Sequence, residues 1–208
     1  MNTEVGTIPA LLVSYVKGLR MVPDFLDRDT CKEVIGQIQS AEYRDEHSSE
    51  PEPKIGNRSP LRYEVDTKYL ALDDIKKRIW NFVLLQYGGE TDDIVPEFTI
   101  AAKMYPGDRH PLHADNVQLD GETPNHTAHR CHSAILYLNT RGHHFTGGSL
   151  VFPGLMKTVS PVAGLLVTFP SGFDYRHEVL PIVSRHRYTL AMWFTRDESR
   201  QEAWSRSG

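Results

Sequence analysis

The stretch from Cys131 to Asn139, CHSAILYLN, decides how the second half of this chain is expected to fold. It is rich in apolar residues and ends at an asparagine, which is typical of a strand bounded by a turn. Because side chains alternate across a strand, Ser133, Ile135 and Tyr137 share one face. We expect this face to point into the interior of a barrel.

Five further stretches of the second half have the same character, and each is bounded by Gly, Pro, Asn or Asp. They are EFTIAAKMY (97–105), GGSLVFPG (147–154), GLLVTFP (164–170), RHEVLPIV (176–183) and RYTLAMWF (187–194). Many short strands at such spacing favour a sandwich or a barrel.

The first half contains two helix patterns. Asp29 or Thr30 is expected to cap a helix that continues to about Tyr43. A second helix, with its apolar residues on one face, is expected over 73–86. Helices followed by strands indicate an α+β domain in which the helices support one sheet.

Two other segments of the first half have less regular patterns. The polar, proline-containing stretch EHSSEPEPKIGNRSP (46–60) predicts a long loop that either covers a site or moves, and its EPEPK part is either a lid or a solvated loop. PALLVSYV (9–16) is too short to span a bilayer and lacks a basic leader and a cleavage site, so we expect a strand or packing segment there.

Composition favours one domain. The 208 residues, 39% of them hydrophobic, suffice for one core. We expect helical support and loops over 1–97, a strand core over 98–195, and a frayed polar tail over 196–208, apart from Trp204.

Charge and cysteine content limit which binding partners and which cellular compartment are expected. Lysine and arginine total 23 against 27 acidic residues, which gives no electrostatic case for nucleic acid or an anionic membrane. The two cysteines, Cys31 and Cys131, lie far apart and form no disulfide framework. A cytoplasmic location is therefore expected, because such usage suits a reducing compartment.

The stretch RHPLHADNVQ (109–118) holds the first candidate site residues. In an extended segment His113 and Asp115 project from the same side. An iron(II) centre of the oxygenase type needs two histidines and one carboxylate on one face. His177 is the best third ligand, because it opens a late strand and can approach the first pair across a closed barrel.

Arg187 follows His177 by ten residues, with Pro181 and a turn between them. This hairpin would place the guanidinium deeper in the same barrel. An organic acid that chelates the metal at one end needs an anchor for its far carboxylate, and a guanidinium binds a carboxylate bidentately. We therefore expect Arg187 to be that anchor.

Together these features resemble the iron(II)- and 2-oxoglutarate-dependent dioxygenases, specifically the prolyl 4-hydroxylase-like branch. The matching elements, in chain order, are Tyr105 with Gly107, His113 and Asp115, ILYLN (135–139), GGSLVFPG (147–154), SPVAGLLVTFP (160–170), His177 and Arg187. The resemblance covers about 98–195, nearly half of the chain. It implies a double-stranded β-helix (jelly roll, cupin-like) core with the metal triad at one mouth.

The resemblance also implies cofactors and further roles. Fe(II) would bind the triad and 2-oxoglutarate would extend inward to Arg187, with ascorbate as a candidate reductant. Tyr105 and Tyr137 would donate hydrogen bonds to the cosubstrate, and Trp193 would line the pocket. The reaction would hydroxylate an unactivated C–H bond with dioxygen and form succinate and CO2. Halogenating relatives lack the carboxylate at the position of Asp115, which argues against halogenation.

Plainer roles remain open for several of these residues. Arg187 could form a structural salt bridge, and Tyr105 and Tyr137 could be ordinary core tyrosines. Surface or hydrogen-bonded roles are expected for three histidines, His47, His110 and His186. A zinc site is an alternative for a second group, which consists of His126, His129, Cys131, His132, His143 and His144.

Substrate choice is expected to reside in the loop 116–131, with Arg130 as a substrate contact by resemblance to hydroxylases. The first 97 residues leave no room for the peptide-binding domain of collagen-type hydroxylases, so a small molecule such as an amino acid or natural-product intermediate is preferred. A prolyl or other residue of a protein or peptide is the alternative substrate. A non-catalytic jelly-roll module that binds iron or an organic acid is the alternative function, and a homodimer is possible.

Overall fold

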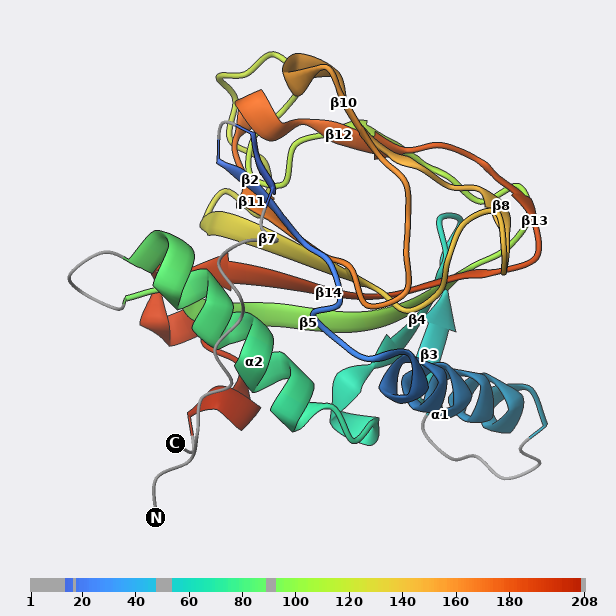
Figure 1. Cartoon of the computed structure of the whole chain (residues 1–208). Helices are drawn as coiled ribbons and strands as arrows, with labels where there is room; N and C mark the ends of the chain where they lie inside the picture. The colour runs from blue at the N-terminus through green and yellow to red at the C-terminus, as the bar shows by residue number, and fades with distance from the viewer. Residues whose placement is uncertain (1–13, 17, 48–53, 89–92, 207–208) are drawn as a thin grey trace.

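The computed structural model describes residues 14–16, 18–47, 54–88 and 93–206. Its strands form two facing sheets, and both helices lie on the outer side of the larger sheet (Figure 1). The larger sheet has the order β1-β2-β11-β7-β14-β5-β4-β3 and the smaller one β10-β9-β12-β6, while β13 and β8 form a separate pair. This arrangement confirms the expected jelly-roll core with supporting helices.

The bounds of the elements are as follows. The helices are α1 (Arg28–His47) and α2 (Asp73–Val83). The strands are β1 (Ser14–Val16), β2 (Leu19–Val22), β3 (Gly56–Arg58), β4 (Tyr63–Asp66), β5 (Val95–Met104), β6 (His110–His113), β7 (Arg130–Tyr137), β8 (Thr146–Gly147), β9 (Leu150–Phe152), β10 (Lys157–Val159), β11 (Leu166–Pro170), β12 (His177–Val179), β13 (Ile182–Ser184) and β14 (Arg187–Thr195).

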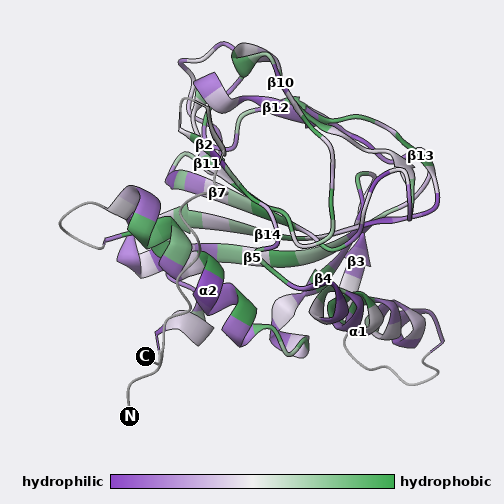
Figure 2. Cartoon of the chain, viewed as in Figure 1, coloured by the Kyte–Doolittle hydropathy of each residue, from purple (hydrophilic) through white to green (hydrophobic). Residues whose placement is uncertain are grey.

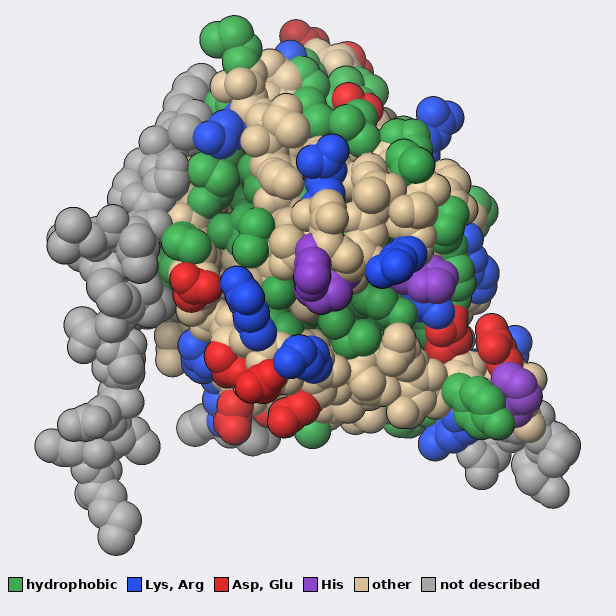
Figure 3. Space-filling view, turned by 45° about the vertical axis from the view of Figure 1, so that its right-hand side comes forward, with side chains coloured by type: hydrophobic (Ala, Val, Ile, Leu, Met, Phe, Trp, Pro, Cys, Tyr) green, Lys and Arg blue, Asp and Glu red, His purple; other side chains and the backbone are tan. Residues whose placement is uncertain are grey.

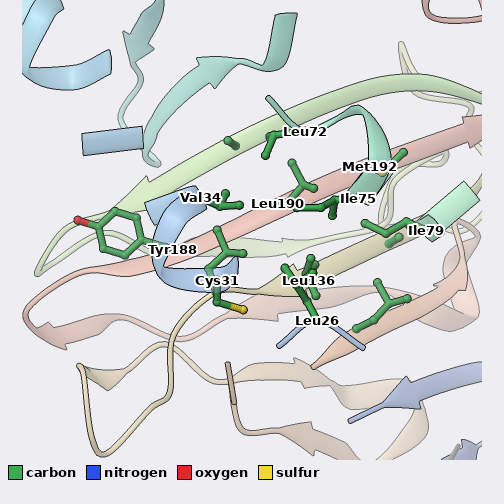
Figure 4. Packing of buried hydrophobic residues seen from close by; sticks show 14 of the residues in the cluster. Leu26, Cys31, Val34, Leu72, Ile75, Ile79, Leu136, Tyr188, Leu190 and Met192 are labelled. Carbon is green, nitrogen blue, oxygen red and sulfur yellow. The ribbon is translucent and has the colours of Figure 1, made fainter. Parts of the chain in front are cut away.

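The helices are held by the outward face of the larger sheet. Leu136, Leu190 and Met192 point away from the barrel and meet side chains such as Val34 and Ile79 of the two helices (Figure 4). Each of these five side chains is at most 2% exposed. Burial of a side chain of this size contributes about 1.5–3 kcal/mol. Apolar residues accordingly mark the sheet-facing side of α2 (Figure 2).

The cap of α1 differs from the expectation. Asp27, and neither Asp29 nor Thr30, caps the helix: its Oδ1 accepts hydrogen bonds from the backbone N–H groups of Thr30 (2.8 Å) and Asp29 (3.1 Å). A short carboxylate satisfies free amide groups of the first turn in this way. The helix therefore starts at Arg28, two residues earlier than a cap at Asp29 would have allowed, and it continues four residues beyond Tyr43, to His47.

The first half contains strands that were not expected. β2 pairs with β11 and β4 pairs with β5, so the chain before residue 97 extends the larger sheet at both edges. β3 lies within the stretch 46–60 that was expected to be a loop. These strands have only three or four residues, which is too short for a clear period of two. Residues 9–13 of PALLVSYV and 50–53 of EPEPK lie outside the described residues.

The polar tail is packed rather than frayed as far as residue 206. Glu202 accepts hydrogen bonds from the hydroxyl of Thr99 (2.6 Å) and the indole N–H of Trp204 (2.7 Å). The Trp204 ring meets Trp80 edge-on, with centroids 6.1 Å apart. The half-buried Glu202 thus fixes this segment against β5, and the aromatic pair fixes it against α2.

A second apolar cluster fills part of the space between the two sheets. Its members include Phe145, Phe152, Phe169 and Leu150, each at most 1% exposed.

In the described part of the chain, neither helix has both the length and the apolar character required to cross a membrane.

Candidate metal centre and cosubstrate pocket

The three predicted metal ligands lie together at the edge of the smaller sheet. β6 and β12 are neighbouring strands, and His113 lies directly opposite His177. Asp115 follows two residues after the end of β6. One ligand atom from each of the three side chains lies within 4.8 Å of the other two.

Backbone carbonyl groups fix the orientation of both histidine rings. Nδ1 of His113 donates to the carbonyl oxygen of Pro111 (2.8 Å), and Nδ1 of His177 donates to that of Tyr175 (3.0 Å). A carbonyl oxygen only accepts hydrogen bonds, so the ring proton lies on Nδ1 in both cases. Each Nε2 is therefore free to bind a metal ion, as expected for supported histidine ligands.

A pair of buried serines orients the carboxylate. The Ser133 hydroxyl donates to Oδ2 of Asp115 (2.6 Å) and lies 2.9 Å from the Ser171 hydroxyl. The backbone N–H of Asp115 donates to the carbonyl oxygen of Ser171 (3.1 Å). Only the inward direction of Ser133 was predicted from the sequence; its contact with Asp115 and the role of Ser171 were not.

The pKa values of the group favour the metal-binding protonation states. Burial alone would raise the pKa of Asp115, but the adjacent His113 and His177 and the Ser133 hydroxyl hold it well below its usual value. Burial lowers the pKa of His177 to about 4. At neutral pH the site therefore presents a carboxylate beside a neutral imidazole, which are the forms that bind a divalent metal ion.

Strand register places the cavity next to this group. Arg187 pairs with Met104 and Thr189 pairs with Ala102 across β14 and β5, and all four side chains line the cavity with Ala191. Directly paired residues point to the same face of a sheet. The small side chains of Ala102, Thr189 and Ala191 leave space there, and Arg187 lies at the far end of the row.

Arg187 is a buried cation without an ion-pair partner among the described residues. It is 4% exposed, its Nη1 contacts the sulfur of Met104 (3.1 Å), and its Nε has no hydrogen-bond partner. The guanidinium carbon lies 5.1 Å from the ring centroid of Tyr137, whose buried hydroxyl also lacks a partner. Burial lowers the pKa of Arg187 and raises that of Tyr137.

Unpartnered buried polar groups are costly, by about 1–3 kcal/mol each and more for a charge. The arrangement is explained if a ligand carboxylate completes it, since one carboxylate can accept from both the guanidinium and the phenol. No carboxylate of the described residues lies within salt-bridge distance of Arg187. The alternative role of Arg187, a structural salt bridge, is therefore not supported. The residues thus fit a dicarboxylate that reaches inward from the metal.

Tyr105 does not belong to this group. It follows Met104 in the chain, so it points to the opposite side, where its ring packs against His186 (centroids 5.2 Å apart) and beneath the guanidinium of Arg58 (4.6 Å). The predicted hydrogen bond from Tyr105 to the cosubstrate does not fit this position. Trp193, in contrast, lines the cavity as predicted.

Arg130 lies beside Trp193 and is held by a glutamate that was not predicted. Its Nε donates to Oε2 of Glu97 (2.8 Å), and its guanidinium carbon lies 4.5 Å from the Trp193 ring centroid. The other carboxylate oxygen of Glu97 lies 3.1 Å from Nε2 of His129. Within the described structure the terminal nitrogens of Arg130 have no partner and remain available to a ligand.

Two more cavity residues were not predicted. Arg62, between β3 and β4, lines the cavity and donates through Nε to Glu64 (2.8 Å). His110 also lines the cavity and packs against His113, with centroids 4.0 Å apart, but lies outside the ligand group. Arg62 is brought to the barrel by β3 and β4, the edge strands that the sequence pattern did not predict.

The alternative zinc cluster does not form. His129 contacts Glu97, the ring of His132 stacks on Tyr87 (4.3 Å), and Cys131 donates to the carbonyl oxygen of Phe194 (3.4 Å). Across the described ranges, the triad is the single group of three or more side chains that could hold a metal ion.

Comparisons with known proteins agree with this geometry. Residues 100–195 match the family model described as the 2OG-Fe(II) oxygenase superfamily. Human prolyl 3-hydroxylase 1 is 39% identical over 106 residues, which are 46% of this chain and 14% of that protein. Chicken prolyl 3-hydroxylase 2 is 37% identical over 99 residues, 42% of this chain and again 14% of the relative. The chain thus spans a small part of these relatives.

Solved structures show the same fold. The viral collagen prolyl hydroxylase of Paramecium Bursaria Chlorella virus-1, in its 2OG complex, gives a TM-score of 0.64 at 19% identity and covers 86% of this chain and 96% of its own. A Pseudomonas putida prolyl-4-hydroxylase gives 0.58 at 26% identity, with 86% and 92% covered. Residues 100–195 therefore resemble the 2OG-Fe(II) oxygenase superfamily in sequence, and the fold of the chain is similar to that of prolyl hydroxylases of the prolyl 4-hydroxylase-like kind.

Proposed function

We propose that this chain is an iron(II)- and 2-oxoglutarate-dependent dioxygenase that hydroxylates a prolyl residue of a protein or peptide. The dioxygenase part is carried by the juxtaposition of the His113, Asp115 and His177 triad with the buried Arg187 Nε and Tyr137 hydroxyl, neither of which has a hydrogen-bond partner. The prolyl part is supported by the names of the relatives that match this same region.

This substrate class replaces the small molecule that the sequence favoured. That preference depended on the expectation that residues 1–97 leave no room for a peptide-binding domain. The Pseudomonas putida prolyl-4-hydroxylase, 92% of which is covered by this chain, is a prolyl hydroxylase of similar extent. A separate domain is thus not required for that chemistry.

Different side chains of the site would bind the metal, orient its carboxylate ligand and bind the cosubstrate. Bound iron would supply the oxidation that couples 2-oxoglutarate decarboxylation to C–H hydroxylation. His113 and His177 would hold the metal through Nε2, and Ser133 would keep the Asp115 carboxylate in position. Arg187 would bind the far carboxylate of 2-oxoglutarate.

The mouth of the cavity has features suited to a peptide. The terminal nitrogens of Arg130 can donate to a backbone carbonyl group, while Glu97 holds its Nε. Trp193 stacks on Phe98, with centroids 5.9 Å apart, and offers an apolar surface to a pyrrolidine ring.

Turnover with defined peptides tests the proposal. The iron-loaded protein is incubated with 2-oxoglutarate and either a Gly-Pro-Pro repeat peptide, an unrelated proline-containing peptide, or free L-proline. We expect succinate formation and the gain of one oxygen atom on a proline of a peptide. Peptides deuterated at C3 or C4 identify the carbon by loss of label. Oxidation of free amino acids alone would contradict the prolyl-peptide proposal and leave the dioxygenase part standing.

Three further features remain proposals. The cytoplasmic location is testable by fractionation, and the homodimer by light scattering of the purified chain. Ascorbate is expected to prolong turnover by keeping the iron reduced, which a time course with and without ascorbate would show.

A further inference from the structure

A second hollow lies outside the barrel, away from the triad. It has a volume of about 910 Å³ and lies between the first half of α1, the segment that follows β7 and the turn before β14. This is within the range of about 300–1,000 Å³ typical of small-molecule sites. None of the metal ligands, and neither Arg187 nor Tyr137, lines it.

The lining of this hollow is cationic. Arg28 and Lys32 come from α1 and Arg185 from the turn, with His143 and His144 on the facing segment, and no aspartate or glutamate lines the hollow. Lys32 is paired with Asp29 (2.7 Å), whereas Arg28 and Arg185 have no ion-pair partner in the described ranges. Figure 3, which turns the α1 side toward the viewer, shows histidine and Lys or Arg side chains near one another on this face.

The conformation of Arg185 is an independent indication. Its φ is +59°, in the left-handed region that favours glycine and asparagine. Such backbone strain often accompanies function. The turn therefore places the positively charged side chain of Arg185 at the hollow, although glycine would adopt this backbone conformation more easily.

His144 adds a directed donor. Its Nδ1 accepts a hydrogen bond from the backbone N–H of Thr140 (3.0 Å), so the ring proton lies on Nε2. This proton is available to an anion. The floor of the hollow is apolar and is built by Ile35, Leu138 and Ala163, with Tyr188 at its side.

We propose that this hollow is a binding site for a small organic anion with an apolar body, such as an aromatic or acyl sulfonate, carboxylate or phosphate ester. The apolar floor takes the body, and Arg28, Arg185 and His144 bind the anionic group. The site shares β14 with the cosubstrate pocket but uses the other face, because Tyr188 points outward where Arg187 points inward.

Fluorescence titration of the full chain with 1-anilinonaphthalene-8-sulfonate tests this site. We expect saturable binding at one site, weakened about tenfold by Arg185→Glu and by Arg28→Glu, since loss of one charged contact is worth about 1.4 kcal/mol. Lys77→Glu, on exposed α2 surface with the same charge change, is the matched control and should leave the affinity unchanged. Equal affinity in all variants would overturn the proposal.

Two further measurements separate anion binding from folding and from simple apolar adsorption. Arg185→Gly relieves the left-handed backbone, so its melting temperature should not fall, yet its affinity for the sulfonate should drop as in Arg185→Glu. N-phenyl-1-naphthylamine, which lacks the sulfonate, should bind more weakly than the sulfonate. An unchanged affinity of Arg185→Gly, or equal binding of the neutral amine, would contradict an anion site.

Discussion

His113 and His177 lie directly opposite each other on β6 and β12, with ring centroids 4.3 Å apart, and each ring donates from Nδ1 to the carbonyl oxygen two residues earlier in the chain. Strand pairing therefore brings the two rings together, and the local backbone turns them. The metal ligands are positioned by the fold itself.

Ser133→Ala removes the hydroxyl that binds Asp115 while leaving all three metal ligands in place. We expect the affinity for Fe(II) or Mn(II) to fall about 10–100-fold, because partners of metal ligands fix their orientation. Isothermal titration calorimetry measures this change, with exposed Ser160→Ala as the control. If the metal affinity is unaltered, the proposed role of Ser133 is wrong.

Arg187→Met replaces the buried guanidinium, whose Nε lacks a hydrogen-bond partner, with an apolar chain of similar length. We expect the affinity for 2-oxoglutarate to fall by about two orders of magnitude with metal binding retained, because a buried bidentate ion pair is lost. Without ligand the melting temperature should not fall, since an uncompensated charge has been removed. A purely structural role for Arg187 would instead give normal 2-oxoglutarate binding and lower stability.

Asp45 ties α1 to the edge strands and should make stability depend on pH. Its carboxylate accepts from the backbone N–H groups of Ile55 (2.8 Å) and Gly56 (2.7 Å) and from the Tyr63 hydroxyl (2.7 Å). Burial alone would raise the pKa of Asp45, but these hydrogen bonds lower it further than burial raises it.

A lowered folded-state pKa stabilises the fold above the unfolded value of about 3.9, and this contribution is lost as the pH falls through the folded value. Asp45→Asn should therefore lower the free energy of unfolding by about 1–3 kcal/mol at pH 7, and the deficit should shrink below pH 4. Urea unfolding at pH 7 and at a pH below 4 measures this deficit in the free energy of unfolding. A deficit that is the same at acid and neutral pH would rule out this role of the charge.

Both cysteines should be unreactive in the folded protein. Burial raises the pKa of the Cys31 thiol to about 11 and that of Cys131 to about 11. The thiolate is the reactive form, so little of it exists at neutral pH. Mass spectrometry after iodoacetamide treatment should show no alkylation without urea and two alkylated sites with it. Rapid labelling of Cys131 in the folded chain would be inconsistent with its packing.

The parts of the site that were predictable depend on local spacing or on alternation. His113 and Asp115 are two residues apart on an extended segment, and the inward face of Ser133 and Tyr137 follows from the period of a strand. Asp27 was missed as the cap because Asp29 and Thr30 are capping residues too, and only the folded structure shows which side chain reaches the free amide groups.

The parts that were not predictable depend on register and on contacts between distant segments. Arg62 reaches the cavity because β4 pairs with β5, and Glu97 on β5 accepts a hydrogen bond from Arg130 on β7. Tyr105 was assigned to the cosubstrate from its motif, but the strand position of Met104 turns it outward. The packed tail depends on Glu202, whose partner Thr99 is far away in sequence.

The central claim is that one ferrous ion bound by the triad and one 2-oxoglutarate anchored by Arg187 share a single site. Anaerobic optical titration of the iron(II)-loaded protein with 2-oxoglutarate tests it most directly. We predict a saturable charge-transfer band in the visible range at one equivalent of 2-oxoglutarate, absent in His113→Ala and greatly weakened in Arg187→Met. No band in the parent protein, or the same band in His113→Ala, would contradict the account.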